Sequence, residues 1–124
     1  MKINILLPYK EKFDENKASS VSITVKNNLL HTKFLSDIRV YGQNIENPLF
    51  KDNFQGINYS ILSLKSKNVF LADEMLKIIS KDRSNKQLIE IHNRPYLVEQ
   101  IANACNFPIS LFLHNDPKTM KGSK

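Results

Sequence analysis

The stretch IEIHNRP at residues 89–95 decides the fold, together with the near repeat ISLFLHNDP at residues 109–117. In each copy a short apolar run leads into the phrase His-Asn-x-Pro. This order is typical of a buried strand that ends in a loop. Because ligands of open parallel sheets bind outside the carboxyl ends of the strands, both copies are predicted to place imidazole, amide and charged groups at the functional edge of one sheet.

Length and composition indicate one globular domain. The chain has 124 residues, of which 41% are hydrophobic and 24% charged, enough for one core and too few for two ordinary domains. The formal net charge of +6 comes from scattered lysines and favours anionic partners such as nucleic acid, phosphorylated substrates or an acidic membrane surface. A nucleic-acid partner is not expected, because basic and aromatic residues do not alternate along one face. The aromatic residues are instead expected in the core: Phe34, Tyr41, Phe50, Phe54, Tyr59, Phe70 and Phe112.

The single cysteine and the short apolar runs bear on the compartment. Cys105 excludes an intramolecular disulfide and a cysteine-based zinc site, and it is predicted to be a buried packing residue in a reducing compartment. The apolar run at residues 3–7 is too short for a signal peptide or a membrane span. The expected location is cytoplasmic, or peripheral at the inner face of the cell membrane.

Hydrophobic periodicity predicts an α/β fold. The expected strands cover residues 2–7, 38–41, 57–62, 86–91 and 109–113, and the expected helices cover residues 19–33, 68–81 and 95–105. Strands that are apolar throughout are typical of parallel strands covered on both faces. We therefore expect a Rossmann-like three-layer sandwich with a mostly parallel sheet of strand order 3-2-1-4-5. Leu113 is expected to point into its core.

The end of the sequence is polar and offers no closing helix or strand. We expect residues 1–117 to form the domain and residues 118–124 to be a loose tail leading to a missing segment. The far face of the fifth strand is then expected to be incompletely covered. The alternative is a frayed natural C-terminus, which is common.

In the expected strand order, the first and fourth strands flank the switch point of the sheet, where ligands bind. The lip of this crevice is predicted to consist of Tyr9 and Lys10 on one side and His92, Asn93 and Arg94 on the other. His114 is expected one strand further out. Asn93 could cap the helix that begins at residue 95, and a guanidinium at a helix start is a natural receptor for an anion.

These residues also allow other interpretations. His92 and His114 could simply cap their strands, but two histidines in the same phrase on adjacent strands favour a functional site. A metal site of His92, His114 and Asp116 is not favoured, because no helical histidine pair supports it. His31 is expected to be structural, at the end of the first helix. The sequence has neither a Gly-x-Gly-x-x-Gly fingerprint nor a Gly-Lys-Ser/Thr loop.

The opening strand INILLP at residues 3–8, the two His-Asn-x-Pro phrases, the helix start at residues 18–20 and the tail MKGSK at residues 120–124 carry a family resemblance. Over essentially its whole length, the chain resembles the N-terminal half of a family 4 glycosyltransferase of the GT-B fold. The resemblance is to the bacterial enzymes of surface-polysaccharide and lipopolysaccharide biosynthesis.

This resemblance implies a retaining transferase that moves a sugar from a nucleotide-sugar to a glycan or lipid-linked acceptor, without a cofactor or a bound metal. The N-terminal domain would hold the acceptor, and a missing C-terminal domain would bind the donor. His114 matches the family histidine near the reacting sugar and is the implied catalytic residue. The implied substrate-binding residues are His92, Asn93, Arg94, Asn115, Asp116, Tyr9, Lys10, Ser19 and Ser20.

The chain departs from the family in its first turn. Relatives often carry two glycines where this sequence has Ala18, Ser19 and Ser20, so a close approach of the donor phosphate is in doubt there. Two classes of function therefore stay open. One is a glycosyltransferase N-terminal domain that is inactive alone, and the other is a freestanding Rossmann-like module that binds an anionic ligand at the same edge.

Overall fold

The computed structural model describes residues 1–16, 19–60, 62–82 and 86–114. The predicted α/β fold is confirmed: the described residues form a five-stranded sheet of order β3-β2-β1-β4-β5, in which every pairing is parallel. The strands are β1 (Lys2–Leu6), β2 (Ile38–Gln43), β3 (Phe54–Ile57), β4 (Gln87–His92) and β5 (Ile109–Phe112). The helices are α1 (Ser20–His31), α2 (Lys67–Ser80) and α3 (Tyr96–Ala104), with a 3-10 turn at Leu35–Asp37.

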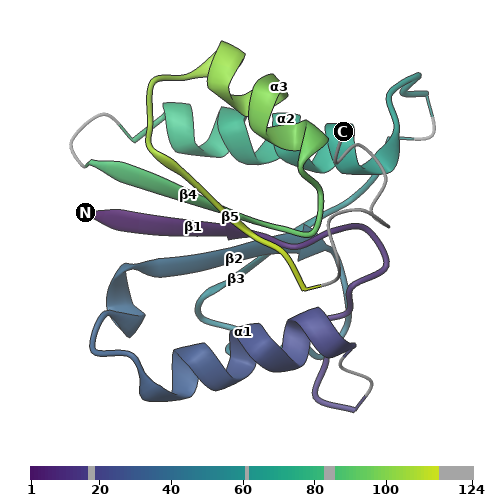
Figure 1. Ribbon diagram of the computed structural model, residues 1–124. Coiled ribbons are helices and arrows are strands. Elements are labelled where there is room, and N and C mark those ends of the chain that lie inside the picture. The colour runs from purple at the N-terminus through teal and green to yellow at the C-terminus, as the bar shows by residue number, and fades with distance from the viewer. Residues whose placement is uncertain (17–18, 61, 83–85, 115–124) are drawn as a thin grey trace.

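The elements form three layers, with α2 and α3 on one face of the sheet and α1 on the other (Figure 1). Alternating strand residues divide the core between the two faces. Leu6 and Ile91 belong to the cluster under α2 and α3, whereas Ile5 and Val40 belong to the cluster under α1. No helix in the described part of the chain is long and apolar enough to cross a membrane.

The third strand was predicted at residues 57–62, which is wrong: it runs over Phe54–Ile57. Phe54 pairs with Val40 of β2 and stacks on Phe13, with 5.9 Å between ring centroids. Packing of this ring thus decides where the strand lies, although the sequence around it has no clear period. Leu62, which the prediction placed in the strand, is 87% exposed.

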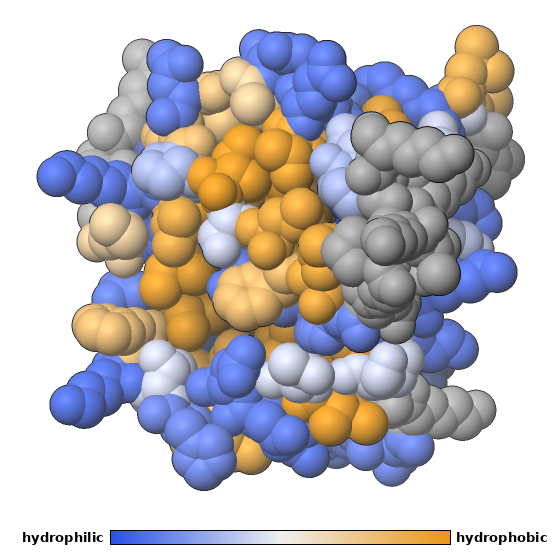
Figure 2. Space-filling model, viewed as in Figure 1, coloured by the Kyte–Doolittle hydropathy of each residue, from blue (hydrophilic) through white to orange (hydrophobic). Residues whose placement is uncertain are grey.

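β5 differs from the other strands because its second half is open to solvent. Leu111 and Phe112 are 36% and 42% exposed, and Leu113, directly after the strand, is 41% exposed. Apolar side chains gather across the middle of the face that Figure 2 shows, on the side where β5 is the front strand of Figure 1. The expected incomplete cover of the fifth strand is therefore observed. The expectation that Leu113 points into the core is wrong.

Two aromatic residues and the cysteine differ in burial from what the sequence predicts. The expected core position is wrong for Phe34, which is 59% exposed, and for Phe112. Cys105 is half-buried against the core under α2 and α3, and its Sγ donates a hydrogen bond to the carbonyl oxygen of Ile101. The expected tail at residues 118–124 lies outside the described residues.

Candidate functional site

The two predicted histidines meet at the carboxyl edge of the sheet. His92 ends β4, and its register partner Phe112 ends β5. His114 follows two residues later, so its side chain returns to the same face of the sheet. Nδ1 of His92 and Nε2 of His114 are 2.7 Å apart, a distance at which the two rings share a hydrogen bond.

A carboxylate that the sequence did not single out completes this group. Oε2 of Glu90 lies 2.8 Å from Nε2 of His92, and the His92 side chain is fully buried. The ring of Phe112 stacks on the His92 ring, with 5.2 Å between centroids and 11° between planes. Spacing of two residues along one strand puts Glu90 and His92 on the same face, which was the available signal.

Asn93 joins the ends of β4 and β5. Its Oδ1 accepts a hydrogen bond of 2.7 Å from the backbone N–H of His114, and its own N–H donates to the carbonyl of Phe112 at 2.9 Å. Its φ of 56° lies in the left-handed region, which asparagine tolerates better than most residues. The predicted helix cap is therefore wrong: the cap position of α3 is Pro95, without a side-chain hydrogen bond.

Arg94 keeps most of its donors available. Its Nη1 donates to the carbonyl oxygen of Asn93 at 2.5 Å, and its half-buried guanidinium has no other partner in the described part of the chain. The arrangement retains a cation beside the start of α3. Its remaining N–H donors are compatible with the predicted role as receptor of an anionic group, which stays a prediction.

Tyr9 lies in the loop after β1 and is held by the start of α2. Its backbone N–H donates to Oδ1 of Asn68 at 2.7 Å, and its hydroxyl accepts from Nζ of Lys67 at 2.6 Å. That hydrogen bond lowers the pKa of Tyr9, against a smaller opposing effect of burial. The same ammonium lies 4.2 Å from the centre of the Tyr9 ring and 5.4 Å from that of Tyr59, a cation–π arrangement. Lys67 and Asn68 were not predicted as site residues.

A hollow of about 290 Å³ opens beside this tyrosine–lysine group. Its lining mixes hydroxyl, ammonium and aromatic groups: Tyr59, Ser60, Ser63, Lys65, Lys67 and Phe70. The hydroxyl of Tyr59 is buried and has no hydrogen-bond partner among the described residues. Burial raises the pKa of Tyr59 above its ordinary value, so this hydroxyl stays protonated.

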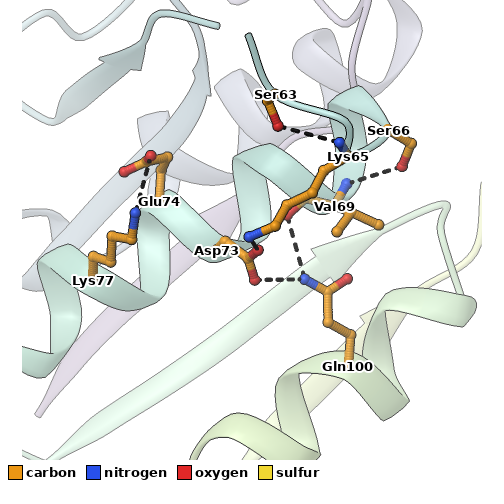
Figure 3. Close-up of polar contacts among 8 residues, drawn as sticks. All are labelled: Ser63, Lys65, Ser66, Val69, Asp73, Glu74, Lys77 and Gln100. Atoms are coloured by element: carbon orange, nitrogen blue, oxygen red, sulfur yellow. Dashed lines mark hydrogen bonds and ion pairs between the residues drawn. The ribbon is translucent and has the colours of Figure 1, made fainter. Parts of the chain in front are cut away.

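Polar contacts connect the start of α2 with the segment before it and with α3 (Figure 3). Oγ of Ser66 accepts from the N–H of Val69 at 3.4 Å and caps α2. Asp73 lies between the two helices, where it pairs with Lys65 and accepts from Nε2 of Gln100 at 2.9 Å. The start of α2 and the side chains that it presents to Tyr9 are thereby held in place.

The remaining predicted residues lie less centrally. Lys10 is exposed with a φ of 76°, and its N–H donates to Gln43. Oγ of Ser19 accepts from the N–H of Lys12 at 3.0 Å, and Ser20 is the exposed first residue of α1. The structure does not bring Ser19 or Ser20 into contact with the histidine pair. Asn115 and Asp116 lie outside the described residues.

Charged groups surround His114 unevenly. Burial, followed by the charge on His92, lowers the pKa of His114, and Glu11 and Glu90 act in the opposite direction. Oε2 of Glu11 is buried and has no hydrogen-bond partner among the described residues. No group of three or more histidine, cysteine or acidic side chains in the described ranges could hold a metal ion.

No family model matches the chain, and neither the search of curated proteins nor the search of solved structures found a match.

Proposed function

We propose that the chain is the acceptor-side domain of a retaining glycosyltransferase, which moves a sugar from a nucleotide-sugar to a glycan or lipid-linked acceptor in surface-polysaccharide biosynthesis. The observation that carries this proposal is the contact of His92 with His114 at the carboxyl ends of β4 and β5. These are the two histidines on which the family resemblance depends, and their phrases lie 22 residues apart in the sequence.

The chemistry of the edge suits a saccharide. Sugar hydroxyl groups both donate and accept hydrogen bonds. The carboxyl edge of the sheet offers imidazole, carboxylate, phenol and guanidinium groups that can bond to them. Tyr9 and Tyr59 add an edge-to-face aromatic pair with 5.4 Å between ring centroids, which gives the apolar side of a sugar ring a surface to contact.

In this proposal the nucleotide-sugar donor binds to a separate C-terminal domain. The sequence contains no Glu-x7-Glu pattern of the kind that the family uses for the donor. The chain alone would therefore bind an acceptor and transfer no sugar. The reaction would take place in the cytoplasm at the inner face of the membrane, where a net charge of +6 favours an anionic surface.

Binding and turnover are tested separately. Titrating the ¹⁵N-labelled chain with oligosaccharides and a lipid-linked glycan should shift the amide signals of residues 90–94 and His114. The His114→Ala variant should lose this response, whereas His31→Ala, at the exposed end of α1, should keep it. Mixing the chain with nucleotide-sugars and the same acceptors should give no product. Turnover by the chain alone, or no saccharide response at this edge, would contradict the proposal.

A second candidate is a freestanding module that binds an anionic ligand at the same edge. It is favoured by the cations there: Arg94 with unused donors, and Lys10 and Lys67 around Tyr9. Inorganic pyrophosphate is the probe. Binding of pyrophosphate that Arg94→Gln abolishes and Lys77→Gln spares, without any response to saccharides, would favour this candidate over the transferase domain.

A further inference from the structure

Glu90, His92 and His114 form an unbroken hydrogen-bonded series. Oε2 of Glu90 lies 2.8 Å from Nε2 of His92, and Nδ1 of His92 lies 2.7 Å from Nε2 of His114. The side chain of His92 is fully buried and Glu90 is only 17% exposed. Both ring nitrogens of His92 are thus engaged by protein atoms, and only the far end of the series can meet a ligand.

The position of each proton follows from these contacts. An ionised carboxylate can only accept, so Nε2 of His92 must carry a proton. In the neutral ring the other nitrogen is then an acceptor, so Nδ1 of His92 receives a hydrogen bond from Nε2–H of His114. Neutral His114 is left with a bare Nδ1, for which the described part of the chain provides no hydrogen-bond partner.

We propose that Glu90 is a positioning residue that sets the tautomers of both imidazoles and so makes Nδ1 of His114 a hydrogen-bond acceptor for a hydroxyl group of the ligand. The identification of that hydroxyl as one of an acceptor saccharide rests on the proposed function. The proton positions do not depend on it, because they belong to the ligand-free chain.

Burial of His114 favours this neutral state, because it is the largest effect on the pKa of His114 and lowers it. The acidic groups that face His114, Glu90 on β4 and Glu11 in the loop after β1, raise its pKa, and a charge on His92 would lower it only in the protonated pair. From β5, Phe112 contributes an apolar ring that stacks on His92. When the pair gains one proton, Nδ1 of His114 becomes a donor whichever ring holds the charge, because Nε2 of His92 stays bonded to the carboxylate.

Nitrogen NMR of the imidazole rings tests the proton positions directly. Above the titration range of the histidines, His92 and His114 in the ¹⁵N-labelled full chain should both be protonated at Nε2 and bare at Nδ1. In Glu90→Ala the carboxylate that accepts from Nε2–H of His92 is absent. Because the two rings share one hydrogen bond, both should shift together toward the opposite tautomer. Glu99→Ala, an exposed carboxylate on α3, is the matched control and should leave both tautomers unchanged.

Two results would overturn the inference. One is a protonated Nδ1 on His114 in the parent chain, a measurement that stands even if Glu90→Ala does not fold. The other is a folded Glu90→Ala variant whose two tautomers equal those of the parent.

Ligand binding separates this inference from the proposed function. Glu90→Ala should weaken binding of the responding oligosaccharide by about tenfold, the effect of one lost hydrogen bond, whereas Glu99→Ala should not. Expected tautomers without any saccharide binding would overturn the saccharide as ligand and the proposed function with it. Saccharide binding with unexpected tautomers would overturn the role of Glu90 alone.

Discussion

Replacing Asn93 tests whether one residue holds the two strand ends of the site together. The side chain is 6% exposed, and its Oδ1 accepts the backbone N–H of His114 at 2.7 Å. Asn93→Ala leaves that N–H without its partner, which costs about 1–3 kcal/mol. Alanine in the left-handed region at a φ of 56° costs about 1–2 kcal/mol more. We therefore expect Asn93→Ala to lower the free energy of unfolding by about 2–5 kcal/mol.

Asn93→Gly separates the hydrogen bond from the backbone conformation. Glycine loses the same hydrogen bond but adopts a positive φ without strain, and its greater freedom in the unfolded chain costs about 0.5–1 kcal/mol. The glycine variant should therefore be more stable than the alanine variant by about 0.5–1 kcal/mol.

Urea denaturation with linear extrapolation measures both differences. Asn103→Ala, an exposed asparagine on α3, is the control and should change stability by no more than about 0.5 kcal/mol. If Asn93→Ala is as stable as the parent, Asn93 does not join the strand ends. If alanine is no worse than glycine, the conformational part of the reasoning is refuted.

Three further predictions concern pH, the core and the sheet. Burial lowers the pKa of His114 from 6.5, so the unfolded chain binds more protons and the free energy of unfolding should fall as the pH drops below about 6.5. Denaturation at a series of pH values should show a weaker fall in His114→Gln than in the parent chain. Equal slopes in the two chains would refute this prediction. Ile91→Ala, at a position 1% exposed, should lower the free energy of unfolding by about 2–5 kcal/mol. Leu113→Ala, at a position 41% exposed, should lower it by less than about 1 kcal/mol. Equal decreases in urea denaturation would contradict the assignment of Ile91 to the core and Leu113 to the surface. A Cβ on Gly56 would lie 3.1 Å from the backbone of the loop after β2, whereas a Cβ on Gly42 would meet atoms no closer than 3.6 Å. Gly56→Ala should therefore lower the melting temperature, and Gly42→Ala should change it little. The reverse order of melting temperatures would refute the steric explanation.

Most of the fold could be predicted from the sequence because the helices and strands depend mainly on local sequence patterns. Apolar runs such as residues 3–7 and 89–91 alternate with segments of helical period, and parallel connections are right-handed in nearly all proteins. These two facts leave few possible strand orders. β3 was misplaced because Phe54 is held by its contact with Phe13, 41 residues earlier in the chain, and local sequence carries no record of such a contact.

The site was predictable only in part, for a similar reason. His92 and His114 follow apolar runs, so their position at the strand ends is visible in the sequence. Lys67 starts a helix far from Tyr9 in sequence, and only the packing of α2 beside β1 brings its ammonium to the tyrosine hydroxyl. The role of Asn93 depended on a positive φ, which asparagine can adopt but does not require.

The polar groups at the two ends of the sheet differ in how completely they pair with one another. At the amino end, the buried Asn4 donates to Gln87 at 2.8 Å and accepts from the Tyr41 hydroxyl at 3.1 Å. Polar groups that satisfy one another in this way stabilise the fold and have little left to offer a ligand.

At the carboxyl end the balance is different. Nδ1 of His114, buried Oε2 of Glu11 and the remaining donors of Arg94 have no hydrogen-bond partner among the described residues. Of these, Oε2 of Glu11 is buried, and leaving a buried polar atom unpaired costs free energy. In the proposed function these open positions at the carboxyl edge would form hydrogen bonds with the acceptor, whereas the paired groups of the amino end would not.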